Sequence, residues 1–174
     1  MATQTEKTPA SCQVVGPDGS QTWDPTHVDA WIGLLQTHRQ LTRELDARLD
    51  ADHGLSLSGL ELLARLAAAP DHWLRLSTLA AQTGLSLSRV SRIVDVLEER
   101  ALVERRHCPS DARAINAHLT GAGAALLTDA ERTHRATVQR AFFDHLRLTE
   151  VETLAEVFAR FAPGAAAACS GAGA

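Results

Sequence analysis

The stretch from residue 77 to residue 120 constrains the fold of this 174-residue chain more than any other part. Its apolar and turn-forming residues predict two short helices separated by a tight turn at Gly84, and then a β-hairpin. The hairpin tip carries Cys108-Pro109-Ser110-Asp111-Ala112-Arg113. Helix, turn, helix and basic hairpin in this order describe a winged helix-turn-helix, which places its second helix in the major groove of DNA. The sequence therefore predicts a DNA-binding regulator.

Composition predicts a mainly α-helical chain whose β-structure is largely the hairpin. The sequence holds 30 Ala and 24 Leu, which are strong helix formers, but only 13 Val and Ile together, which favour strands. We expect residues 1–22 to be disordered, residues 23–162 to form a single domain, and the Ala- and Gly-rich residues 163–174 to be a flexible tail.

Capping residues mark the predicted starts of the helices. Asp24, followed by Pro25, begins a long helix to about residue 50, and Thr120 begins another to about residue 146. The remaining predicted caps are Ser58 (with Glu61), Ser77, Ser86 and Thr149 (with Glu152).

The second helix of the pair is predicted to present polar side chains to DNA. Its apolar residues recur at helical spacing and are expected to pack inward: Val90, Ile93, Val94 and Leu97. The opposite face then presents Ser88, Arg89, Ser91, Arg92 and Asp95. An Arg fork can bind guanine O6 and N7 together, and Ser can bond bases or phosphates. Ser88, Arg89, Ser91 and Arg92 are therefore the predicted groove contacts, although an ordinary solvated helix face is the plainer alternative.

The hairpin supplies further candidates for DNA contact. Arg113 is predicted to enter the minor groove, and Asp111 to hold its guanidinium or cap the turn. Arg105 and Arg106 are expected to touch phosphates or to support the wing. A surface turn with a weak ion pair is the alternative for the Asp111–Arg113 pair. In the second strand, Ile115, Ala117 and Leu119 alternate with Asn116 and His118, and residues 74–76 fit a very short additional strand.

Charge supports DNA binding only weakly. The formal net charge of the chain is −4, whereas residues 77–120 carry six Arg against five acidic residues. Binding depends on the field at the contacting face more than on the total charge. This small local excess leaves open a second function: a protein-interaction module that keeps the winged fold without binding DNA in a sequence-specific way.

These residues together resemble the MarR-type (multiple antibiotic resistance) transcriptional regulators. The matching segments are Leu79-Ala80, residues 91–100 (SRIVDVLEER), Leu102-Val103-Glu104-Arg105, Asp111-Ala112-Arg113 and Leu119-Thr120 with Gly123. The resemblance implies a winged helix-turn-helix at about 72–120 and a homodimer formed by helices at about 24–52 and 120–162. It also implies binding to a pseudo-palindrome of double-stranded DNA. Many such regulators are repressors that release DNA when a small, often phenolic, ligand enters the cleft between the dimer helices and the DNA-binding part.

Two residues depart from the pattern of that family. Ala101 stands where the family usually has Gly after the second helix, and a left-handed backbone there makes Ala cost about 1 kcal/mol. Ala112 replaces the middle Arg of the wing motif, which removes one expected phosphate contact. Arg113 keeps the position that enters the groove.

Three residues of the first long helix are candidates for lining an effector cleft: Trp31, His38 and Arg39. Trp and His at such positions are more often packing residues of the core or of the dimer than ligand contacts, and Arg39 also fits a solvated position.

The remaining chemistry of the chain is sparse. Cys12, Cys108 and Cys169 form no disulfide framework and favour a reducing cytoplasm, with oxidation of Cys108 beside DNA as an alternative means of regulation. His107, Cys108 and His118 give only a weak zinc hypothesis, because no metal motif has the usual spacing. We expect no cofactor, no enzymatic activity and no membrane span.

Overall fold

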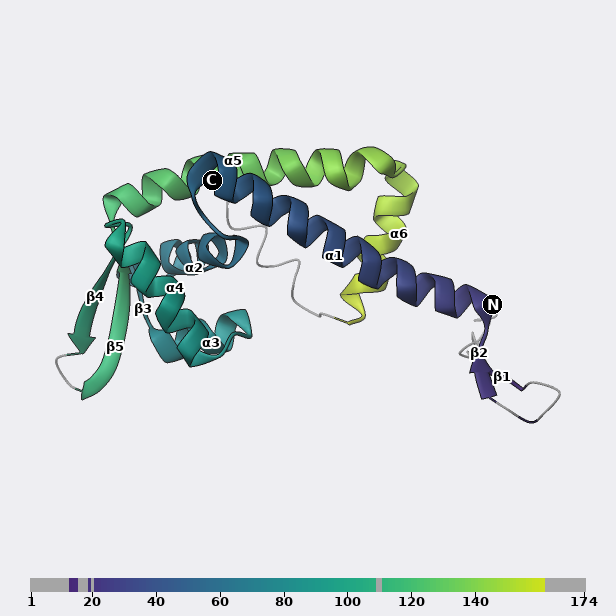
Figure 1. Ribbon diagram of the computed structural model, residues 1–174, viewed down its shortest axis with the longest axis horizontal. Helices are drawn as coiled ribbons and strands as arrows, with labels where there is room; N and C mark the ends of the chain where they lie inside the picture. Colours follow the sequence, from purple (N-terminus) through teal and green to yellow (C-terminus); the bar gives the residue numbers. More distant parts are fainter. Residues whose placement is uncertain (1–12, 16–18, 20, 109–110, 162–174) are drawn as a thin grey trace, which may run out of the picture. The chain divides into compact units, whose positions relative to one another are not determined.

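The computed structural model describes residues 13–15, 19, 21–108 and 111–161 (Figure 1). The chain divides into two compact units, Met1–Gln40 and Leu41–Ala174. The long helix α1, Pro25–His53, contributes residues to both units. Within the described ranges, no helix combines the length and the apolar character that crossing a membrane requires.

The first unit contains a short antiparallel pair of strands, β1 (Gln13–Val15) and β2 (Gln21–Trp23). This pairing corrects the expectation that all of residues 1–22 are disordered. Val and Thr favour strands, and Gly19 supplies a left-handed φ of 79° in the connection between them. Asp24 then caps α1 as predicted, because its carboxylate accepts the Thr26 N–H at 2.9 Å.

The second unit holds the predicted winged helix-turn-helix followed by two further helices (Figure 1). The mainly α-helical class with a small β-wing is therefore confirmed. After α1 the elements are α2 (Leu57–Ala68), a 3-10 turn (Pro70–His72), β3 (Trp73–Arg75), α3 (Leu76–Thr83), α4 (Leu87–Glu99), β4 (Val103–Cys108), β5 (Asp111–Leu119), α5 (Gly121–Ala141), a second 3-10 turn (Phe143–His145) and α6 (Leu148–Ala159).

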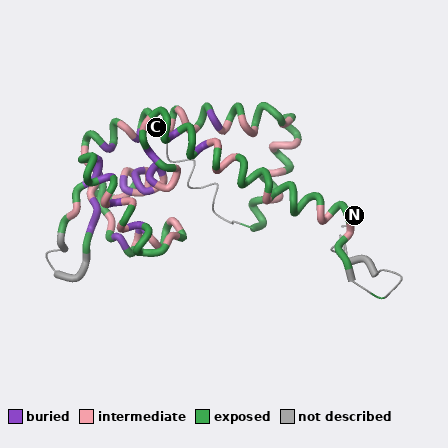
Figure 2. The backbone as a smooth tube through the Cα atoms, in the orientation of Figure 1, coloured by how far each residue is buried: buried purple, intermediate pink, exposed green. Residues whose placement is uncertain are grey.

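The core of this unit lies between α2, the α3–α4 pair and the sheet. Buried residues follow one another along α2, which is largely purple in Figure 2, and belong to one core cluster with buried residues of α4 and the sheet. The core residues include Leu62, Leu63, Leu66, Leu79, Val90, Val94, Leu97, Val103, Ala117 and Leu119. Burial of this apolar surface fixes the orientation of α4, because three of its inward residues belong to the core.

The sheet has three antiparallel strands in the order β3-β5-β4, so β5 is central. Ala117 and Leu119 are buried as the alternation predicts, but Ile115 is exposed and Asn116 is only 1% exposed. The prediction for these two residues is wrong: Ile115 pairs with His107 on β4 but lies one residue beyond the part of β5 that pairs with β3. Asn116 pairs with Arg75 on β3 and with Arg106 on β4, so its backbone lies between two neighbouring strands.

Several helix boundaries also differ from the predicted ones. The cap of α2 is Ser56 and not Ser58: the Ser56 hydroxyl accepts the Gly59 N–H at 3.0 Å. Arg75, not Ser77, precedes α3, and Glu150, not Glu152, closes the start of α6 by accepting the Arg147 N–H at 2.8 Å. Helix α5 ends at Ala141, before the predicted residue 146, because Phe142 leaves helical geometry with φ of −133° and ψ of −64°.

Candidate nucleic-acid interface

Local sequence features determine where helix α4 begins. Gly84 ends α3 in a left-handed conformation with φ of 67°, as expected of the turn residue. The Ser86 hydroxyl then caps α4 by accepting the Arg89 N–H at 3.3 Å. Val90, Val94 and Leu97 anchor the helix to the core, and its remaining faces stay available for contacts outside the protein.

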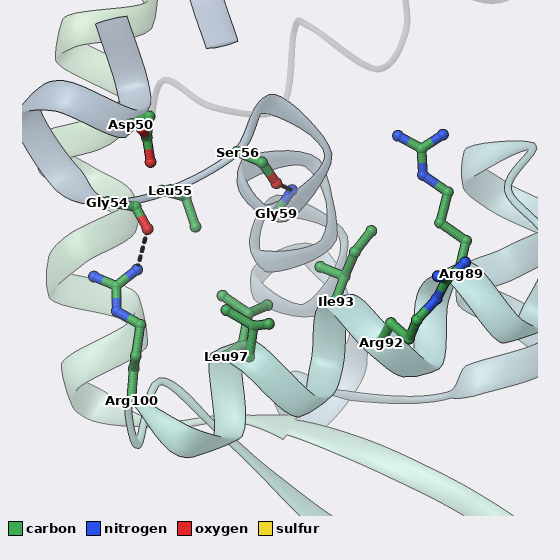
Figure 3. Close-up of a pocket in the computed structure, with 11 residues that line it drawn as sticks. Asp50, Gly54, Leu55, Ser56, Gly59, Arg89, Arg92, Ile93, Leu97 and Arg100 are labelled. Atoms are coloured by element: carbon green, nitrogen blue, oxygen red, sulfur yellow. Dashed lines mark hydrogen bonds between the residues drawn. The ribbon is translucent and has the colours of Figure 1, made fainter. Parts of the chain in front are cut away.

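The outward face of α4 presents Ser88, Arg89 and Arg92 in exposed positions. Within the described part of the chain, neither guanidinium forms a hydrogen bond or an ion pair with another residue, and Figure 3 shows both side chains extending from α4. Two guanidinium forks on one helix face suit the bidentate recognition of guanine or phosphate. The structure therefore brings three of the predicted groove residues together on one exposed surface.

Ser91 and Arg105 lie on the side of α4 that faces the wing, the β4–β5 hairpin. One Arg105 nitrogen, Nη2, donates to the Ser91 carbonyl oxygen at 2.9 Å and to its hydroxyl at 3.1 Å. The other, Nη1, forms an ion pair with Asp95 and lies 3.8 Å from Glu98. Of the two roles expected for Arg105, these contacts favour support of the wing over phosphate contact.

The neighbouring Arg106 differs from Arg105 in its exposure and in its ion-pair partner. Its side chain is 63% exposed and pairs with Glu104 on the same strand at 2.9 Å. An exposed ion pair of this kind contributes little to stability and is easily exchanged for a phosphate contact. Arg113 and Asp111 belong to β5, but their side chains lie outside the described residues, so their predicted roles stay predictions.

A pocket of about 580 Å³ lies on the side of α4 opposite the wing (Figure 3). Its lining combines apolar and basic side chains with one carboxylate from α1: Asp50, Leu55, Arg89, Arg92, Ile93, Val96, Leu97 and Arg100 are among them. The pocket thus joins the end of α1, the start of α2 and the outer edge of α4.

Arg100 connects α4 to the end of α1 across this pocket. Its Nη1 donates to the Gly54 carbonyl at 2.5 Å and its Nη2 to the His53 carbonyl at 2.8 Å, the first drawn as a dashed line in Figure 3. Gly54 turns the chain there with φ of 58°. His53 also bonds through Nε2 to the Thr133 hydroxyl of α5 at 2.8 Å. The sequence analysis missed this connection, because Arg100 lies 46 residues from Gly54.

The predicted effector residues Trp31, His38 and Arg39 occupy exposed positions on α1. None of the three lines the pocket beside α4 or a smaller one of about 360 Å³ beside β3. Their role in ligand binding therefore stays a prediction. Among the described residues, no three His, Cys, Asp or Glu side chains gather as a metal site requires, and the side chains of His107 and Cys108 lie outside that part.

Comparison with known proteins identifies the family to which the chain is similar, the MarR family. The MarR family model matches residues 53–114. The structure of Sco3205 from Streptomyces coelicolor, a MarR family regulator in complex with DNA, is similar with 31% identity. That match has a TM-score of 0.74 and covers 83% of this chain and 91% of that one. AbsC, a MarR family regulator from the same organism, has 30% identity and a TM-score of 0.73, with coverage of 82% and 95%.

A more distant match shares the fold alone. A mutant of MarR from E. coli, complexed with operator DNA, has 21% identity and a TM-score of 0.65, with coverage of 79% of this chain and 98% of that one. No curated protein sequence matches the chain.

Proposed function

The chain belongs to the MarR family of transcriptional regulators, and on this premise we propose that it binds a pseudo-palindromic operator as a homodimer and represses transcription. Sco3205 was solved with DNA, and the match extends over most of both chains. The observation that carries the proposal is the outward face of α4, on which Ser88, Arg89 and Arg92 are exposed. In a winged helix-turn-helix this face enters the major groove.

Exposed apolar side chains on the two outer helices support the proposed dimer. No residue of α6 is buried: Val151, Leu154 and Val157 are partly exposed and Phe158 is exposed, and the four recur at helical spacing. On α1, Trp31, Ile32 and Leu34 are exposed as well. Apolar surface of this kind is typical of an interface with a partner chain.

The pocket beside α4 supports release of DNA by a small ligand. Its volume falls within the usual range for small-molecule sites, and three arginines face an apolar lining, which suits an aromatic anion such as a phenolate. Arg89 and Arg92 are also proposed DNA contacts, so a ligand bound there competes with DNA for the same side chains. Trp31, His38 and Arg39 remain the proposed residues of a further cleft at the dimer helices.

Selection of bound sites from a random DNA pool, at two salt concentrations, tests the DNA-binding proposal. The expected result is a pseudo-palindrome with half-sites about one helical turn apart. Arg92→Ala is expected to cost about 1 to 3 kcal/mol and to relax the preference at one position if Arg92 contacts a base. Arg132→Ala, which removes an exposed cation of α5, is the matched control. If the wild-type chain enriches no sequence and residual binding vanishes with modest salt, the protein-interaction alternative takes its place.

A panel of phenolic acids tests the effector proposal. A ligand of the free protein is expected to raise its melting temperature and to weaken operator binding by the same factor by which DNA weakens ligand binding. Ligands that stabilise the protein without changing DNA affinity would contradict the proposed competition.

A further inference from the structure

We infer that Arg105 is a positioning residue for DNA recognition: it fixes the Ser91 hydroxyl so that its proton is directed to an acceptor on DNA. This inference rests on the proposed DNA-binding function and specifies how one residue of the interface acts. In this inference Arg105 acts within the protein, between β4 and α4, whereas a basic residue on the wing is ordinarily expected to contact phosphate.

The contacts of Arg105 run along α4 rather than away from it. Ser91, Asp95 and Glu98 are spaced four and three residues apart, so they form one stripe on the wing side of the helix. The Arg105 guanidinium bonds to the first, pairs with the second and lies beside the third. Its backbone N–H also donates to Glu98 Oε1 at 2.9 Å. Arg105 therefore joins β4 to α4 through side chain and backbone together.

Burial makes this arrangement difficult to exchange for a phosphate contact. The Arg105 side chain is 24% exposed, against 63% for Arg106. Its Nε is buried without a hydrogen-bond partner among the described residues. Moving the guanidinium to DNA would break its bonds to Ser91 and leave two carboxylates of α4 without their counter-charge beside the phosphates.

The bond from Arg105 decides what Ser91 can offer. A serine hydroxyl has one proton and two lone pairs. Arg105 occupies a lone pair, and no acceptor for the Ser91 proton is present within the described residues. The half-buried hydroxyl is thus oriented to donate, which suits guanine O6 or N7, thymine O4, adenine N7 or a phosphate oxygen.

A double-mutant cycle on operator affinity tests the inference, with Ser91→Ala, Arg105→Ala and the double variant. We expect Arg105→Ala to weaken binding about tenfold or more, and the double variant to be no weaker than Arg105→Ala alone. Arg92→Ala and Arg105→Ala form the control pair. Their fold-losses in operator affinity are expected to multiply in the double variant, because Arg92 has no contact with Arg105. Independent, multiplicative losses for Ser91 and Arg105 would overturn the inference.

Arg105→Lys separates positioning from a simple charge. A lysine keeps the positive charge and binds phosphate well, but its single nitrogen does not reproduce the fork in which Nη2 bonds to Ser91 while Nη1 pairs with Asp95. We expect this variant to bind about as weakly as Arg105→Ala and to show the same coupling to Ser91. Near wild-type affinity for Arg105→Lys would instead assign Arg105 to a phosphate.

Two controls keep the outcomes distinct. Arg106→Ala measures the effect of losing an exposed cation from the same strand, and thermal unfolding of each variant verifies that it is folded at the assay temperature. Failure of the wild-type chain to select any sequence refutes the proposed function, whereas selective wild-type binding without Ser91–Arg105 coupling refutes only this inference.

Discussion

Ala101, in the turn after α4, has a strained backbone conformation with a positive φ. Its φ is 56°, which confirms the left-handed geometry for which the family usually has Gly. Its N–H donates to the Glu98 carbonyl at 2.8 Å, and the Leu102 N–H donates to the Leu97 carbonyl at 2.9 Å. This pair of bonds is the Schellman ending of a helix, in which glycine is preferred at the left-handed position.

Ala101→Gly is therefore expected to stabilise the protein by about 1 kcal/mol, because glycine adopts this φ without steric cost. Chemical denaturation with urea measures the change. Ala125→Gly, at an exposed position inside α5, is the matched control and is expected to destabilise by about the same amount. If Ala101→Gly destabilises the protein as Ala125→Gly does, the strain assigned to Ala101 is contradicted.

His134 links stability to pH. Burial lowers the pKa of this half-buried imidazole below its ordinary value of about 6.5, and the charge of Glu131 opposes the shift in part. The unfolded chain then binds the proton more readily than the folded chain. Stability is lost as the pH falls through about 6.5 toward the folded-state pKa.

We expect NMR titration of the His134 ring to give a midpoint below 6.5, and His134→Gln to reduce the loss of unfolding free energy between about pH 7.5 and 5.5. A midpoint at or above 6.5 would contradict the assigned burial. His145→Gln, at an exposed position after α5, verifies that the effect does not follow from removing any imidazole of this region.

At the scale of elements, the junction between the wing and α5 leaves no room for a side chain at Gly123. An added Cβ would lie 2.1 Å from the Leu102 carbonyl oxygen and 2.7 Å from Leu119 Cδ1. Thr120 holds the same junction, since its hydroxyl donates to the Leu102 carbonyl at 3.0 Å and accepts the Gly123 N–H at 3.0 Å. The start of α5 is thereby packed directly on Leu102, in the turn between α4 and β4.

Gly123→Ala is expected to destabilise by about 1 to 3 kcal/mol, because backbone must move to admit the methyl group. Gly121→Ala offers a matched control two residues earlier, where an added Cβ meets nothing within 4 Å. Urea denaturation of both variants distinguishes steric exclusion from a general effect of alanine in the first turn. A neutral Gly123→Ala would indicate that the junction is looser than the described contacts.

Sequence patterns predicted elements well where one local signal determines them. Ser86, Gly84 and Thr120 act at the expected positions, because a cap or a left-handed residue depends on its nearest neighbours. Helix α2 is capped by Ser56 and not by Ser58. The Leu57 N–H donates at 2.7 Å to the carboxylate of Asp46, eleven residues before Leu57, and this bond favours a helix start at Leu57. Such non-local partners are invisible to a pattern of adjacent residues.

The same distinction separates the predicted from the unpredicted parts of the candidate site. Exposure of Ser88, Arg89 and Arg92 follows from the helical period alone. Whether Arg105 faces DNA or α4 depends on strand register and on two acidic residues of another element, so the sequence left both roles open. No local sequence pattern predicts the bonds from Arg100 to the Gly54 and His53 carbonyls.

At the scale of the whole molecule, the exposed apolar side chains of α6 predict that stability depends on protein concentration. Phe158→Ala is expected to weaken dimerisation about tenfold or more, since aromatic residues often dominate an interface. Analytical ultracentrifugation measures the dissociation constant. Glu156→Ala, an exposed truncation on the same helix, is the control. A monomeric wild-type chain at all concentrations would remove the basis of the pseudo-palindrome.

The bonds from Arg100 to the end of α1 fix the C-terminal end of α4, so a tilt of the helix about that end would displace its N-terminal end the most. From Arg100 to Ser88 the helix extends roughly 18 Å, at 1.5 Å per residue. A tilt of about 10° around that end moves the far end by roughly 3 Å, close to the 3.4 Å step between neighbouring base pairs. Because Val90, Val94 and Leu97 are buried along the same helix, such a tilt would require the core to repack, so core packing limits the shift of Ser88 between base pairs.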